Sequence, residues 1–178
     1  VDPDIRATRE VADSRFARSG FAEGPRSDAT AGPRFVLLHT LAHLLLREMA
    51  YPAGYSAASI RERIFHGPTE TGWANGILLY TADGDSEGTL GGLVRLGEPA
   101  RLRAALERVV ERGAWCGQDP VCRESRGQGL HALNLAACHG CALVSETSCA
   151  HANVLLDRNR VVSRRAGAPG FLVETMGE

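Results

Sequence analysis

All five cysteines of this chain lie in one segment toward its C-terminal side, and their spacing constrains the fold more than any other feature. A CxxC pair presents two thiolates to one point, and a second pair at a distance completes a tetrahedron around zinc. An odd number of cysteines fits a secreted disulfide framework poorly and reduced thiols in a cytoplasm better. The pattern therefore predicts a closed, structural zinc site whose candidate ligands are Cys138, Cys141, Cys149, Cys122 and Cys116.

The spacing also ranks these candidates, because five cysteines compete for four positions. Cys138 and Cys141 form the CxxC pair and are the firmest candidates. Cys149 comes next, and Cys122 and Cys116 follow because their separation is wider than in a normal zinc knuckle. A redox CxxC and inert or disulfide-bonded cysteines are the alternatives, and the extra cysteines nearby argue against redox chemistry.

A second candidate group is the pair His39 and His43, which are spaced i and i+4 in a predicted helix. That spacing places both imidazoles on one helix face, where they could bind a metal. Residue 40 is Thr40 instead of Glu, so the pair is not the HExxH motif of metalloproteases. The favoured interpretation is a pair of hydrogen-bonded histidines in the core or at an interface, with metal binding as the alternative.

Composition limits the function classes only weakly. With 178 residues and a formal net charge of −1, the chain suits one domain, and its charge balance gives no sign of a nucleic-acid or membrane partner. All the basic residues are Arg, and binding of phosphate by them requires that they cluster in space. No window approaches ~18 consecutive apolar residues, and the first ~30 residues lack the apolar core of a signal peptide. We therefore expect no membrane span and a cytoplasmic location.

Hydrophobic periodicity predicts the secondary structure. The pattern over 34–50 is apolar on nearly all sides, which predicts a buried helix, and an amphipathic helix follows Pro99 over 99–112. Shorter helices are expected over 57–65, 130–137 and 151–158. Strands are expected over 76–81 and 171–174, and loops over 66–75 and 83–92. Together these elements predict an α/β or α+β fold, a small sheet packed by helices with a C-terminal zinc-binding cysteine knuckle.

Three groups of motifs carry a family resemblance, and they occur in the family's order. The first group comprises 38–45, 54–56 and 62–65, and the second comprises 76–81 and 87–93. The third comprises 115–116, 119–122, 134–141, 146–149, 153 and 156–158. They resemble the MrfA-like zinc-binding domain, in the DrmB-like version of DISARM phage-defence systems. The resemblance covers 34–160, which leaves 1–33 as a linker or disordered N-terminal segment and 161–178 as a C-terminal tail.

The resemblance implies a zinc-stabilised, non-enzymatic accessory domain that works with a superfamily-2 helicase protein on DNA in anti-phage defence. The chain itself contains no Walker A motif, so it can supply only the accessory part. If the domain contacts DNA directly, the first candidates for that contact are the arginines that follow the cysteines: Arg158, Arg160, Arg164 and Arg165. The other interpretation of this run is a solvated tail. The alternative functions are a zinc-stapled protein-interaction module with no nucleic-acid role, and an enzyme that uses the CxxC or the histidine pair.

Overall fold

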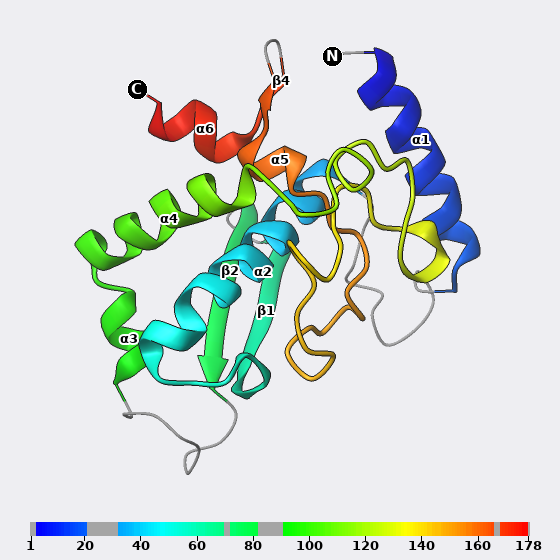
Figure 1. Ribbon diagram of the computed structural model, residues 1–178. Helices are drawn as coiled ribbons and strands as arrows, with labels where there is room; N and C mark the ends of the chain where they lie inside the picture. Colours follow the sequence, from blue (N-terminus) through cyan, green and yellow to red (C-terminus); the bar gives the residue numbers. More distant parts are fainter. Residues whose placement is uncertain (1–2, 21–31, 70–71, 82–90, 166–167, 178) are drawn as a thin grey trace.

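The computed structural model describes residues 3–20, 32–69, 72–81, 91–165 and 168–177 (Figure 1). At its centre is helix α2 (Pro33–Ala53), which confirms the helix expected over 34–50. Pro33 starts α2 because its fixed φ suits the first turn of a helix. Gly54 ends the helix in the left-handed conformation (φ 78°), where its N–H bonds back to carbonyls of the last turn. Most side chains of α2 are buried, as its nearly continuous apolar sequence predicts.

The only described sheet of more than two-residue strands is an antiparallel hairpin of β1 (Ile60–Thr69) and β2 (Gly72–Thr81), and it lies beside α2 (Figure 1). The strand expected over 76–81 is confirmed as the second half of β2. The helix expected over 57–65 is wrong, because only the 3-10 turn η1 (Ala57–Ser59) is helical there. The loop expected over 66–75 is also wrong, since Ile64 pairs with Ile77 and the pairing continues to the turn.

The alternation of side chains along β1 explains why this segment is a strand. Ile60, Glu62 and Ile64 are buried, whereas Arg61 and Arg63 between them are exposed. This period of two is that of a half-buried strand, not of an amphipathic helix. It turns the carboxylate of Glu62 toward α2 and the interior.

Two further helices cover another side of α2, the short α3 (Gly92–Leu96) and α4 (Pro99–Gly113). The helix expected over 99–112 is confirmed, and Ala105 and Val109 of its apolar stripe are buried. Most of the loop expected over 83–92 lies outside the described residues. At the end of α4, Gly113 allows a close approach, because a Cβ there would lie 3.0 Å from Cγ2 of Val162.

From residue 114 to 158 the described chain has turns and irregular backbone, with one isolated bridge between Gln128 and Asn134 and one 3-10 turn, η2 (Leu130–Ala132). The helices expected over 130–137 and 151–158 are therefore wrong. Positive φ angles at positions such as His131 and Asn153 are incompatible with a continuing helix. Hydrogen bonds organise the segment instead: Asn134 Nδ2 donates to the Asn153 carbonyl (2.7 Å), and Asn134 Oδ1 accepts from the backbone N–H of Leu156 (3.0 Å).

The chain ends in α5 (Asn159–Val162), a pair of two-residue strands β3 (Arg164–Arg165) and β4 (Ala168–Pro169), and α6 (Phe171–Met176). The strand expected over 171–174 is wrong, because this segment forms α6. A short apolar run has no periodicity that separates a buried strand from a helix. Leu172 of α6 is buried in the core, while Phe171 is exposed.

A helix, α1 (Pro3–Arg18), occupies much of the segment expected as a linker or disordered region. It contacts the turn region of the chain through Arg15, whose Nη1 donates to the carbonyls of Arg126 (2.8 Å) and Ala132 (3.0 Å). Phe16 packs against a buried cluster that includes Phe35 and Leu133. These contacts with residues distant in the sequence hold α1 against the turn region and the buried cluster. The local sequence pattern does not predict them. The boundaries of a separate domain over 34–160 stay a prediction.

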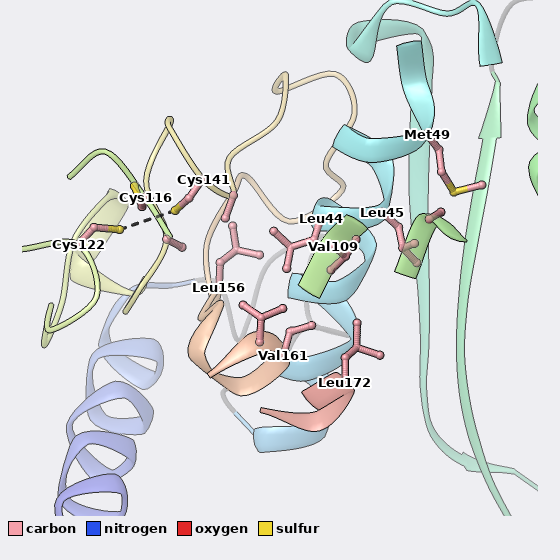
Figure 2. Close-up of a cluster of buried hydrophobic side chains, with 14 of the residues drawn as sticks. Leu44, Leu45, Met49, Val109, Cys116, Cys122, Cys141, Leu156, Val161 and Leu172 are labelled. Carbon is pink, nitrogen blue, oxygen red and sulfur yellow. Dashed lines mark hydrogen bonds between the residues drawn. The ribbon is translucent and has the colours of Figure 1, made fainter. Parts of the chain in front are cut away.

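The main core lies between α2, α4 and the C-terminal elements, and Figure 2 shows it. Leu44, Leu45 and Met49 of α2 meet Val109 of α4 and, from the C-terminal part, Leu156, Val161 and Leu172. Three of the cysteines lie at one end of this cluster. The fold is therefore a mixture of helices with a small antiparallel sheet, as expected, with the cysteine region toward the C-terminal side. Across the described ranges, no helix has the length and apolar character needed to cross a membrane.

Candidate metal centre

Four of the five cysteines converge on one point: Cys116, Cys122, Cys138 and Cys141. The Sγ–Sγ distances are 3.5 Å from Cys116 to Cys138, 3.7 Å from Cys122 to Cys141 (Figure 2), and 3.7 Å within the CxxC pair. Zinc–thiolate bonds of about 2.3 Å in a tetrahedron require Sγ–Sγ edges of about 3.8 Å. A disulfide requires about 2.05 Å, so these thiols are free and have the separation of metal ligands.

Hydrogen bonds from the chain point at these sulfurs. The backbone N–H of Gln118 donates to Cys116 Sγ (3.4 Å), and the backbone N–H of Cys138 donates to Cys141 Sγ (3.3 Å). Gln128 Nε2 approaches Cys122 Sγ at 3.7 Å. Donors of this kind stabilise a thiolate more than a thiol. These hydrogen bonds therefore favour the thiolate form of the cysteines in the cluster.

The pKa shifts of Cys122, Cys138 and Cys141 show what the cluster requires. Burial raises the pKa of Cys122 and of Cys141. Burial also works to raise the pKa of Cys138, but hydrogen bonds with Cys116 and Cys122 outweigh it and lower that pKa. Several buried thiolates cannot coexist without a compensating positive charge, which a divalent ion would supply. Four thiolates would fill a tetrahedral zinc ion and leave no open position for a substrate.

An ion pair between the buried Arg158 and the half-buried Asp119 fixes the loop that carries the first two cysteines. Asp119 accepts a hydrogen bond from the backbone N–H of Cys116 (3.0 Å) and another from Arg158. Arg158 also donates to the carbonyl of Gly113 at the end of α4 (2.8 Å). Burial works to raise the pKa of Asp119, but the hydrogen bond and charge of Arg158 outweigh it and lower the pKa. The pair therefore ties α4, the cysteine loop and the segment before α5 together.

This placement corrects one expectation about the arginine run. Arg158 is only 1% exposed, so it cannot contact a DNA phosphate and acts inside the fold. Arg160 is half-buried and lies 3.7 Å from Asp157. Arg164 and Arg165 are exposed in β3, so of the four they alone present a free guanidinium surface among the described residues.

Cys149, ranked third among the candidates, lies apart from the other four cysteines. It belongs to a second group with His39, His43 and Glu62. His39 Nε2 lies 3.3 Å from Cys149 Sγ and 3.0 Å from Glu62 Oε1, and His43 Nε2 lies 3.4 Å from the same oxygen. The histidine pair is buried as expected, but its ring nitrogens face a carboxylate and a thiol. Sequence reasoning missed Glu62, although its place in the alternation Ile60-x-Glu62-x-Ile64 was a signal that it points inward.

Four converging cysteine thiols in a turn-rich segment, packed on helices, define a small domain of the zinc-binding class. The chain belongs to the MrfA Zn-binding domain family, whose sequence model matches residues 41–142. The resemblance found in the sequence is thereby confirmed. The chain is also 41% identical over 128 residues to the DISARM protein DrmB of Bacillus paralicheniformis. That alignment covers 72% of this chain but only 22% of DrmB, so the chain spans about a fifth of the length of its curated relative.

Proposed function

We propose that this chain is a non-enzymatic, zinc-stabilised accessory domain of a DISARM-type anti-phage defence system. One observation carries the proposal: the alignment with a DISARM protein runs over most of this chain, which includes a closed group of four thiols. The relation to a DISARM component supports the defence setting. We further propose that the domain acts together with a superfamily-2 helicase protein on DNA. This part of the proposal rests on the family resemblance in the sequence.

In this proposal the zinc ion would be held by Cys116, Cys122, Cys138 and Cys141, where it would cross-link segments that have little regular secondary structure of their own. The chain's own residues prepare that site. Arg47 of α2 donates to the carbonyls of Gly140 (3.0 Å) and Leu143 (2.8 Å), which fixes the CxxC turn against the helix. A domain of this kind presents a rigid surface, and it needs no general acid, base or nucleophile.

Exposed apolar side chains next to the cysteines support contact with a protein partner. Trp115 and Val121 are 70% and 79% exposed, and they lie beside Cys116 and Cys122 in the chain. A protein interaction surface needs exposed large apolar side chains, and this loop supplies two. Zinc would hold the loop that carries both of them, which connects the metal with partner binding.

The test is retention of the DISARM helicase protein by the affinity-tagged chain. We expect retention by the wild type, loss of retention by Trp115→Ser combined with Val121→Ser, and retention by the control Val94→Ser, which changes an equally exposed apolar residue on α3. Gel shifts at two salt concentrations test DNA contact, since phosphate contacts release counterions and make binding weaker at high salt. Retention of the helicase without any DNA binding would favour the interaction-module alternative, and the absence of both would contradict the proposal.

A further inference from the structure

The group of Cys149, His39, His43 and Glu62 brings together side chains from three parts of the fold. The histidines come from α2, Glu62 from the inward face of β1, and Cys149 from the turn-rich segment. The two imidazoles are 0% exposed, the carboxylate is 2% exposed and the thiol is 5% exposed. A carboxylate is almost never buried this deeply unless a charge or a metal compensates for its lost hydration. This group lies outside the four-cysteine cluster, and neither the family's zinc site nor the proposed function requires it.

This group has more hydrogen-bond acceptors than hydrogen atoms to donate to them. His43 Nδ1 lies 3.0 Å from the carbonyl oxygen of Ala142, which can only accept, so Nδ1 carries the proton. In a neutral ring Nε2 is then a lone pair, and it faces Glu62 Oε1 at 3.4 Å. Two acceptors face each other, and a proton on Nε2 would place an imidazolium in the interior. Among the described residues, neither oxygen of Glu62 nor His43 Nε2 has a hydrogen-bond partner of good geometry.

His39 faces the same shortage. Its Nε2 lies 3.0 Å from Glu62 Oε1 and 3.3 Å from Cys149 Sγ, and one ring nitrogen carries at most one hydrogen atom. A cation between these atoms would satisfy all of them, because each offers it a lone pair. Zinc bonds of about 2.1 Å to nitrogen and oxygen in a tetrahedron require edges of about 3.4 Å, close to the observed separations.

The surroundings also resemble those of a metal ligand set. A ligating histidine usually donates its other ring N–H to a carbonyl or carboxylate, as His43 does to Ala142. Cys149 Sγ accepts hydrogen bonds from the backbone N–H groups of His151 (3.3 Å) and Asn153 (3.2 Å). The positive φ angles of Ala152 (54°) and Asn153 (55°) curl the backbone around the sulfur. These hydrogen bonds favour a thiolate once a cation compensates its charge, since burial by itself raises the pKa of Cys149.

From this geometry we infer that His39, His43, Glu62 and Cys149 form a second metal site, which takes a divalent transition ion of the zinc type. Two imidazoles, one carboxylate and one thiolate suit zinc, and four protein ligands make the site closed and structural. The ion would join α2 to β1 and to the segment after the CxxC pair. Because Ala142 follows Cys141 directly, the hydrogen bond of His43 links this site to the four-cysteine cluster.

The test is metal stoichiometry of the full chain, measured by native mass spectrometry and elemental analysis after dialysis against zinc-free buffer. We expect two zinc ions per chain in the wild type. Cys149→Ala and Glu62→Gln should each retain one, and Cys138→Ser should also retain one. His151→Gln is the matched control, a buried histidine that packs 5.3 Å from the His39 ring but lies outside the ligand set, and it should keep two.

Cobalt substitution identifies which site remains. In Cys138→Ser, the remaining cobalt should show charge-transfer absorption from a single thiolate, and the further change Cys149→Ala should abolish it. One zinc per chain in the wild type would overturn the inference, and this measurement does not depend on whether any variant folds. Two zinc ions in a folded Cys149→Ala protein would overturn it as well, since the second ion would then lie elsewhere.

Discussion

The ion pair between the buried Arg158 and the half-buried Asp119 makes the most quantitative prediction. Arg158→Met keeps most of the side-chain volume and removes the charge. Breaking a buried pair costs about 3–5 kcal/mol, because the other charge is left without its partner. In this variant Asp119 keeps two hydrogen-bond partners, the backbone N–H of Cys116 (3.0 Å) and Arg123 (2.9 Å). The expected cost therefore lies at the lower end of this range. The Gly113 carbonyl loses its donor, so we expect a loss of about 3 kcal/mol in the free energy of unfolding.

Arg123→Met is the control, because Arg123 contacts the same carboxylate but has a side chain that is 47% exposed. Exposed pairs contribute about 0–1 kcal/mol, so this variant should remain close to the wild type. Urea denaturation of both variants, metal-loaded and at one pH, measures the difference. Arg158→Met should leave any salt dependence of DNA binding unchanged, whereas Arg164→Gln with Arg165→Gln should reduce it. Equal stability losses in the two Met variants would refute the assignment of Arg158 to the interior.

Three further predictions follow from other parts of the fold. Gly113→Leu should destabilise the protein by about 1–3 kcal/mol in thermal unfolding through overpacking against Val162, whereas Gly117→Leu, at an exposed position, should change little. Cys138→Ser should lower the zinc content and the thermal midpoint together, while Val121→Ser should leave both unchanged, and a Cys138→Ser protein with normal zinc content would contradict the four-thiolate site. Burial lowers the pKa of His39 from 6.5 to about 4, so between these values the unfolded chain binds a proton that the folded chain does not. Stability of the metal-free protein should therefore fall as the pH drops from 6.5 toward 4, and urea midpoints that stay level over this range would contradict the buried, neutral state of His39.

The two cysteine-containing groups show how the candidate site depends on chain folding. The spacing of Cys138 and Cys141 in the sequence already places their thiols together, because two intervening residues make a tight turn. The sequence spacing favours Cys149 over Cys122 and Cys116, yet the structure brings the latter two to the CxxC pair. The number of residues between the cysteines did not decide which of them join the CxxC pair. Irregular turns held by side-chain hydrogen bonds can bring together cysteines that are separated by very different numbers of residues.

The sequence by itself determined the elements whose residues repeat with one period over a long stretch. The nearly continuous apolar pattern of α2 and the stripe of α4 leave no other way to bury those side chains, and the CxxC pair needs only its own turn. Tertiary structure decided the rest. The alternation along β1 indicates that Glu62 points inward, but only pairing with β2 and packing against α2 bring its carboxylate to the histidines of α2. Arg158 is buried because Asp119 and the end of α4 offer it partners that lie far away along the chain. Contacts of this kind are set by packing between distant segments, and no local pattern of residues encodes them.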